Sequence, residues 1–169
     1  MIKFSHIGQL HNVVQVVNAR REAGVEIERV RYRGRVKLHG SNAAIVCHRD
    51  GIRAQSRNRE ITPDDDNLGF AGFAFADATV AVVRELEAEL RGATKLEPEQ
   101  PLALFGEWIG PGVQKGVGVA QLPARQWVLF AVATRGEDDL LHAPETSPVL
   151  GLRPACGPAP RVSGAEGKR

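Results

Sequence analysis

Residues 42–56, NAAIVCHRDGIRAQS, decide the fold of this chain. Residues 42–48 and 52–56 have the length and the β-branched content of short strands. The dipeptide Asp50-Gly51 between them is typical of tight hairpin turns, because glycine and aspartate tolerate the backbone angles that such turns need. The stretch therefore predicts two antiparallel strands joined by a short turn.

The segments on either side of this hairpin complete the expected domain. Apolar residues at helical spacing predict helices, and alternating or continuous apolar runs predict strands. The further predicted elements are helices over 10–24 and 76–91 and strands over 25–36, 102–107 and 127–133. Because strands outnumber helices and hairpins dominate the connections, we expect an α+β fold with antiparallel sheets and flanking helices.

Composition limits the class of protein. The chain has 169 residues, 43% hydrophobic and 25% charged, which fits one globular domain of ordinary size. It has no apolar run long enough to cross a bilayer and no signal-peptide pattern, so we expect a cytoplasmic protein without a membrane partner. Its cysteines and histidines lack metal-ligand spacing, so no metal-binding residue is predicted. The net charge of +2 is too small to argue for nucleic acid by itself.

Residues 143–169 differ in character from the rest. They contain five prolines and four glycines and show no periodicity. Such a segment buries too little apolar surface to offset its ordering entropy. We therefore expect one domain over residues 1–142 and a Pro/Gly-rich tail over residues 143–169 that is disordered or loosely attached.

The strongest chemical candidate is KLHGSN, residues 37–42, which lies between two predicted strands. The amine of Lys37 is a nucleophile once it is deprotonated. Gly40 lets the backbone approach a ligand closely because it has no side chain. By itself the motif fits either phosphate chemistry or a surface turn with a solvated lysine.

Four motifs that follow one another along the sequence favour phosphate chemistry over a surface turn. KLHGSN resembles the nucleotidyl-acceptor motif of the covalent nucleotidyltransferases, which comprise DNA ligases, RNA ligases and mRNA capping enzymes. AQSRNREI resembles their arginine-bearing strand, LFGEWIG their ribose-binding FGE motif, and WVLFAVA their adenine-stacking strand. The match runs from about residue 30 to residue 133. DNA ligases and capping enzymes usually carry KxDG, whereas histidine at position 39 looks more like ATP-dependent RNA ligases of the RNA ligase 2 type.

The resemblance implies a role for each matched residue. Lys37 would attack the α-phosphate of ATP and expel pyrophosphate, giving a lysyl-AMP intermediate. Arg57, or Arg59 as the alternative, would contact the ribose or a phosphate, because arginine offers a fixed fork of donors. Glu107 would accept hydrogen bonds from ribose hydroxyls, and Phe130 would stack on the adenine ring. The implied nucleotide-binding residues are His39, Gly40, Asn42, Arg57, Glu107 and Phe130.

Each role has a structural alternative. Arg57 would serve equally as a solvent-facing residue, and Phe130, which alternates with Val128 and Val132, would serve as a core residue. Glu107 ends an apolar strand, where a carboxylate needs a partner if it is buried.

The glycine-rich loop over residues 110–118 does not match a phosphate-cradling motif. The Walker pattern needs a Lys-Ser/Thr pair that opens a helix, whereas Lys115 is followed by Gly-Val-Gly. A flexible loop over the nucleotide site fits better, with Gln114 and Lys115 as candidate nucleic-acid contacts.

Two motifs of the family are missing from the sequence, the EGxV-type strand and the KxK strand. The resemblance therefore implies a C-terminally truncated nucleotidyltransferase (ATP-grasp-like ligase) domain, with two functions left open. The first is an RNA ligase for RNA repair, which uses ATP and Mg²⁺ to join 5′-phosphate and 3′-hydroxyl ends of RNA or another polynucleotide. The second is a non-catalytic nucleotide- or RNA-binding remnant, or a fragment that a second chain completes with the missing strands.

Overall fold

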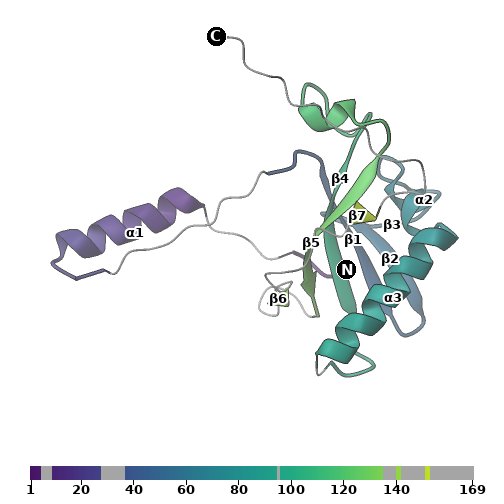
Figure 1. Cartoon of the computed structure of the whole chain (residues 1–169), viewed down its shortest axis with the longest axis horizontal. Helices are drawn as coiled ribbons and strands as arrows, with labels where there is room; N and C mark the ends of the chain where they lie inside the picture. Colours follow the sequence, from purple (N-terminus) through teal and green to yellow (C-terminus); the bar gives the residue numbers. More distant parts are fainter. Residues whose placement is uncertain (5–8, 28–36, 95, 135–139, 142–150, 153–169) are drawn as a thin grey trace, which may run out of the picture.

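The computed structural model describes residues 1–4, 9–27, 37–94, 96–134, 140–141 and 151–152. Its architecture is α+β, as predicted, with one antiparallel sheet and helices beside it (Figure 1). The helices are α1 (Leu10–Glu22), α2 (Phe70–Ala74), α3 (Asp77–Ala93) and the 3₁₀ helix η1 (Gly118–Gln121). The strands are β1 (Ser41–His48), β2 (Gly51–Ser56), β3 (Glu60–Ile61), β4 (Leu102–Ile109), β5 (Gln126–Ala133), β6 (Leu140–Leu141) and β7 (Gly151–Leu152).

The strand order is β3-β2-β1-β4-β5-β6, and β7 also pairs with β5. The predicted hairpin is confirmed, because β1 and β2 pair antiparallel along their lengths. Its turn lies one residue earlier than predicted: His48 faces Gly51, so the loop residues are Arg49 and Asp50. Gly51 has a φ of 150° and opens β2, so the glycine is used at the first strand residue and not inside the loop.

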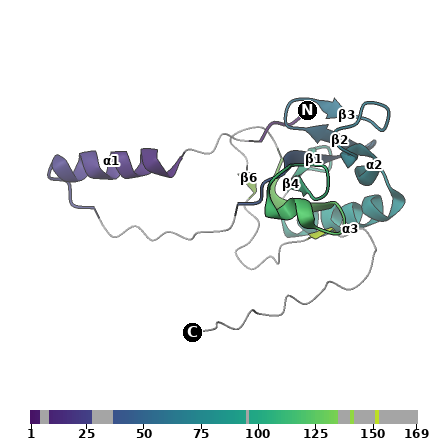
Figure 2. The same cartoon turned by 90° about the horizontal axis from the view of Figure 1, so that it is seen from above.

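Helices α2 and α3 cover one face of the sheet (Figure 2). Because side chains alternate along a strand, Ile45 and Cys47 of β1 both point to this face. Burying an aromatic or branched side chain contributes about 1.5–3 kcal/mol, so this layer holds most of the stabilising contacts. Its largest fully buried side chains are Trp127, Phe70, Ile45, Leu102, Leu104 and Val83.

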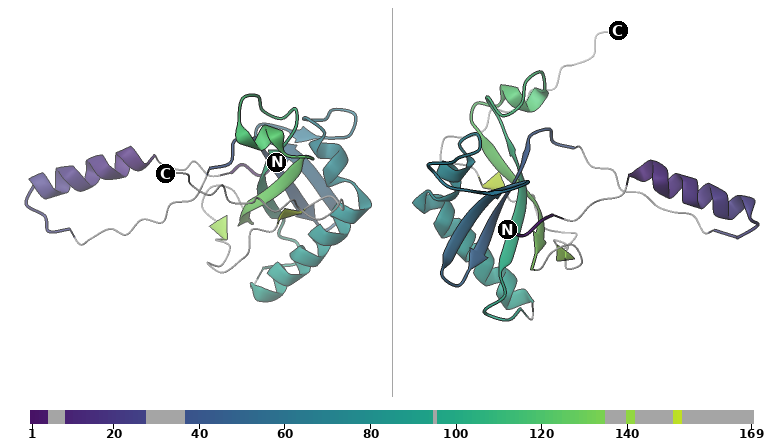
Figure 3. Two further views of the ribbon diagram at one scale, coloured as in Figure 1. Left: turned by 45° about the horizontal axis from the view of Figure 1, so that its top comes forward. Right: turned by 180° about the vertical axis from the view of Figure 1, so that it is seen from behind.

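The first four residues pack on the opposite face (Figure 3). Ile2 and Phe4 cover Val46 of β1 and Phe105 of β4 there. The ring centroids of Phe4 and Phe105 are 5.2 Å apart in an edge-to-face arrangement. The side chain of Gln55 fixes this segment, because its Nε2 donates to the Ile2 carbonyl at 2.5 Å and its Oε1 accepts from the Ile2 N–H at 3.1 Å.

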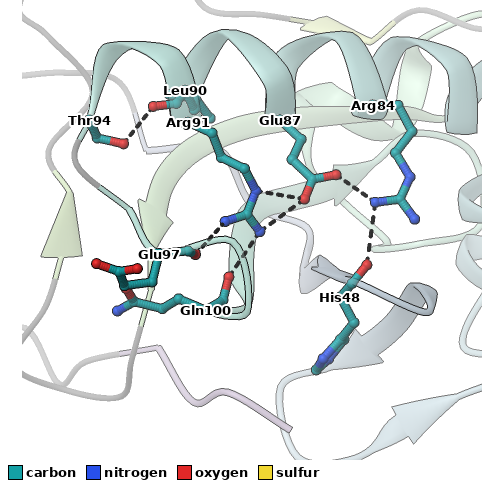
Figure 4. A network of polar contacts seen from close by, with 8 residues as sticks. All are labelled: His48, Arg84, Glu87, Leu90, Arg91, Thr94, Glu97 and Gln100. Atoms are coloured by element: carbon teal, nitrogen blue, oxygen red, sulfur yellow. Dashed lines mark hydrogen bonds and ion pairs between the residues drawn. The ribbon is translucent and has the colours of Figure 1, made fainter.

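A buried carboxylate attaches α3 to the sheet (Figure 4). Glu87 is 8% exposed and accepts hydrogen bonds from Arg84 at 2.5 Å and from Arg91 at 3.0 Å. Arg84 also donates to the His48 carbonyl, and Arg91 donates to the Gln100 carbonyl at 2.9 Å. A buried charge is costly unless it is paired, and both arginines also bind backbone outside α3. The network therefore links the helix to the β1–β2 hairpin and to the segment before β4.

The thiol of Cys47 lies beside this network and gives a pH-dependent prediction. Its burial, and then the negative charge of Glu87, raise the pKa of the thiol to about 12 from its ordinary value of 9.0. The unfolded chain thus loses the thiol proton at a lower pH than the folded chain. The free energy of unfolding should therefore fall as the pH rises above 9, by about 1.4 kcal/mol at pH 10 from this group. Urea unfolding at pH 7.5 and pH 10 measures this fall in the free energy of unfolding.

Cys47→Ala is the matched variant for this measurement. Alanine removes the ionisable group, so the variant should lose less stability than the parent between the two pH values. An equal loss in both proteins would show that the Cys47 thiol does not contribute.

The other predicted elements have mixed outcomes. The first helix is confirmed as α1, which ends in Ala23 and Gly24 with a φ of 77° at the glycine. This helix buries none of its residues and lies apart from the sheet (Figure 1). The predicted strand over 25–36 is irregular at 25–27, and its remaining residues lie outside the described part of the chain. Within that part, no helix is both long enough and apolar enough to span a bilayer.

The later helix and strands are confirmed with small shifts of their ends, as α3, β4 and β5. Asp77 is the first residue of α3 and does not cap it by a side-chain hydrogen bond. The boundary between residues 1–142 and the 143–169 tail stays a prediction, because nearly all of the tail lies outside the described residues. Its two described residues form β7, opposite Trp127 and Val128 of β5.

Candidate active site

The antiparallel topology gathers most of the candidate residues toward one end of the sheet, which is uppermost in Figure 1. This is the end at which β1 and β5 begin and β2 and β4 finish. Asn42 lies at the start of β1, and Lys37 lies four residues before this strand. Arg57 directly follows β2, and Glu107 is near the end of β4. Phe130 lies in β5. Lys37 and Glu107, 70 positions apart in the sequence, thus lie toward the same end of the sheet, whereas Phe130 lies in the middle of β5.

The turn that carries Lys37 is fixed at Gly40. Lys37 and His39 are exposed and precede β1, whereas Gly40 packs directly against β4. A Cβ at Gly40 would lie 2.2 Å from the carbonyl oxygen of Trp108, so only glycine fits there. The amide of Gly40 donates to Oε1 of Glu107 at 2.8 Å. The predicted nucleophile is therefore three residues from a firmly held point of the backbone.

Glu107 and Asn42 are cross-strand neighbours. Asn42 of β1 is paired with Glu107 of β4, so their side chains lie on the same face of the sheet, away from α3. Glu107 is half-buried, and one of its carboxylate oxygens is engaged by Gly40. Among the described residues no donor contacts its second oxygen, and a carboxylate can accept several hydrogen bonds.

Phe130 is not a core residue. The pairing of β4 with β5 shifts register at this point, since Gly106 faces Leu129 and Phe105 faces Ala131, leaving Phe130 as the extra residue of a bulge. Its side chain is 43% exposed. Its ring meets the ring of Phe4 edge-to-face at 5.2 Å, which places it on the face of the sheet opposite α3. The bulge thus presents an aromatic surface on the same face as Glu107.

The two candidate arginines have different surroundings. Arg57 is exposed in the bend after β2, and the preceding residue, Ser56, faces Ala43 of β1. This position brings Arg57 to the end of the sheet where Asn42 lies. Arg59 forms an ion pair with Asp65 within the β3 region. Of the two, Arg57 is the better placed for a bound anion.

Hydrogen bonds join the loops around this end of the sheet, and the sequence did not predict them. Leu68 has a φ of 57°, which is unusual for a residue with a side chain. Its carbonyl accepts hydrogen bonds from the Trp108 indole and from Arg125, both at 2.8 Å. Arg125 also donates to the Pro111 carbonyl at 2.9 Å. Arg125 therefore joins the loop before α2 to the glycine-rich loop that follows β4.

Metal-binding geometry is not evident in the side chains that the structure describes. They contain no group of three or more His, Cys, Asp or Glu residues arranged to hold an ion.

The comparison with protein families fits this geometry. The family model described as RNA ligase matches residues 31–156. The match covers most of the chain and includes the Lys37 turn, β1, β2, β4 and β5. The chain therefore belongs to the RNA ligase family, as the sequence motifs predicted.

Proposed function

We propose that the chain is an RNA ligase-like nucleotidyltransferase of the covalent type, with a nucleotidyltransferase fold and with ATP and Mg²⁺ as cosubstrate and cation. The main observation is that Lys37 lies three residues before Gly40, whose N–H donates a hydrogen bond to Glu107. It supports the proposal because it combines an exposed amine, a close backbone approach and a carboxylate acceptor at one end of the sheet. The family match over this region supports the same class of reaction.

The first step joins the lysine to the nucleotide. The neutral amine of Lys37 attacks the α-phosphorus of ATP, and a nitrogen–phosphorus bond forms. The bond from that phosphorus to the bridging oxygen breaks, its electron pair leaves with pyrophosphate, and the amine proton passes to solvent. Positioning the reactants and stabilising the phosphate charge are the main requirements of such a transfer.

The other residues would bind and orient the nucleotide. Glu107 accepts from the ribose hydroxyls through the oxygen that Gly40 leaves free, and Phe130 offers its exposed face to the adenine. Arg57 reaches the ribose or a phosphate, and His39 and Asn42 lie beside the phosphates. Bound Mg²⁺ would neutralise part of the phosphate charge.

The later steps use RNA or another polynucleotide. An oxygen of its 5′-phosphate attacks the phosphorus of the lysyl-AMP and releases the lysine amine. A 3′-hydroxyl then attacks the activated 5′-phosphate, forming the phosphodiester and releasing AMP. This would serve the repair of RNA breaks, with Lys37 returned to its starting state.

The test is the mass of the intact protein after incubation with ATP and Mg²⁺. We expect the mass of one added AMP, and peptide mapping should place it on Lys37. An ATP analogue with a methylene bridge between the α- and β-phosphates should give no adduct, because the bond between the α-phosphorus and the bridging carbon does not break. If the folded protein binds ATP but never gains AMP, the catalytic proposal is wrong and the binding-remnant alternative takes its place.

A further inference from the structure

The backbone of Gly40 is held on both sides of its Cα. Its N–H donates to Oε1 of Glu107 at 2.8 Å, and its carbonyl oxygen accepts from Nε2 of Gln114 at 3.1 Å. Glu107 belongs to β4, whereas Gln114 belongs to the glycine-rich loop that follows it. Two separate segments therefore bind the backbone of the lysine turn.

This double contact determines how the turn is oriented. Glycine has wide conformational freedom, so Gly40 by itself would leave residues 37–39 poorly directed. Each peptide group is planar, and the N–H and the C=O of Gly40 belong to the two successive peptide planes that meet at its Cα. Hydrogen bonds to both planes therefore restrict φ and ψ at Gly40. The backbone oxygen of Trp108 closes the third side of Gly40. The turn therefore leaves a fixed backbone position and carries Lys37 in a restricted direction.

Gln114 is itself well supported. The preceding residue, Val113, is buried at 8% exposure, and its N–H donates to the Gly110 carbonyl at 3.2 Å. On the same loop, Pro111 accepts a hydrogen bond from Arg125. The loop thus presents the Gln114 amide from an anchored position, and that amide is directed at the protein backbone.

We propose that Gln114 is a positioning residue that holds the Gly40 carbonyl in place. By doing so it sets the direction from which the Lys37 amine approaches the α-phosphate. The proposal rests on the proposed function for its effect on the reaction. Small displacements of a nucleophile lower the rate strongly, so loss of the contact should slow the chemical step while leaving nucleotide affinity largely intact. A contact between Gln114 and the nucleotide would instead change affinity.

The experiment compares Gln114→Ala and Gln114→Glu with Gln121→Ala. Glutamate has nearly the same shape but cannot donate to the Gly40 carbonyl when ionised. Gln121 is an exposed glutamine of η1 and provides a matched control. The first measurement is the hydrogen-exchange rate of the Gly40 amide by NMR, without ATP. The second is the rate of AMP-adduct formation as a function of ATP concentration.

We expect exchange at Gly40 to accelerate about fivefold in both Gln114 variants. Without the hydrogen bond to its carbonyl, the Gly40 backbone opens more often and breaks the bond from its N–H to Glu107. The adduct rate at saturating ATP should fall about tenfold, with the half-saturating ATP concentration changed less than about twofold. Gln121→Ala should match the parent in both measurements.

Three results separate the possible failures. Unchanged exchange at Gly40 in both Gln114 variants would overturn the positioning role. A raised half-saturating ATP concentration with an unchanged maximal rate would also overturn it and would make Gln114 a nucleotide contact. Accelerated exchange in a protein whose parent forms no adduct would support the Gly40 contact while removing the proposed function.

Discussion

Replacing Lys37 by alanine or by arginine is expected to abolish formation of the AMP adduct. Alanine removes the amine, and arginine keeps the positive charge but remains protonated at any usable pH. Neither variant can supply the nitrogen lone pair that the first step needs. Because Lys37 is exposed, the free energy of unfolding should change by no more than about 0.5 kcal/mol. Intact-protein mass and a urea titration measure the two quantities.

Lys3→Ala is the control for this pair of variants. Lys3 is another exposed lysine in the described chain and belongs to the segment that packs on the sheet. Its variant should gain AMP at the rate of the parent. An adduct that persists in Lys37→Ala would place the nucleophile elsewhere and would remove the basis for assigning the turn at residues 37–40.

Local patterns were sufficient to predict the framework of the fold. The hairpin at residues 42–56 and the helix over 76–91 were predictable because alternation, helical spacing and turn residues act over a few neighbouring positions. The short elements β3 and α2 were not predicted. Each has too few residues for a periodic signal. In addition, α2 is held by contacts with distant residues, as in the packing of Phe70 against Trp108 and Trp127.

The same limit applies within α3. The apolar positions Val80, Val83, Leu86 and Leu90 predict one helix face. The last three do pack on the core, whereas Val80 is only half-buried and its neighbour Thr79 is buried instead. The burial of Glu87 on this helix was missed, because a glutamate in a helix is ordinarily solvent-exposed. Its two arginine partners lie three and four residues away on the same helix, at a spacing that the sequence shows. The backbone acceptors of these arginines outside α3 depend on how the helix packs on the sheet.

The candidate site shows where sequence information ends. Motif order placed Lys37, Glu107 and Phe130 in one family pattern, and the family match confirms the membership. It could not show that the Gly40 amide bonds to a carboxylate 67 residues away, because that contact depends on the register of β1 against β4. It also left open whether Phe130 is buried, which the bulge in β5 decides. The roles of these residues in nucleotide binding remain predictions.

Gly106→Ala should give the largest loss of stability among single-methyl changes in the sheet. Gly106 is buried in β4, and a Cβ there would lie 2.2 Å from Nε1 of Trp127. The indole cannot move aside easily, because it is fully buried and its Nε1 donates to the Ala43 carbonyl at 3.2 Å. We expect a loss of about 3 kcal/mol and a fall in Tm of about 10 °C. Urea and thermal unfolding measure them.

Gly92→Ala is the opposite control. Gly92 lies within α3, and a Cβ there would meet nothing within 4 Å. Alanine is the better helix former, so this variant should gain about 0.5–1 kcal/mol. If Gly106→Ala were as stable as the parent, the close packing of β4 against the indole would be wrong.

A double-mutant cycle with Trp127→Phe identifies the atoms responsible. The three atoms nearest the added Cβ at Gly106 are Nε1, Cε2 and Cδ1 of Trp127, all in the five-membered ring of the indole. Phenylalanine lacks that ring, so Gly106→Ala should cost less in the Trp127→Phe background than in the parent. We expect a coupling free energy of about 1–2 kcal/mol. Additive effects would instead mean that the glycine is required by the backbone of β4. A positive result would explain the glycine of the FGE motif by the tryptophan on the neighbouring strand.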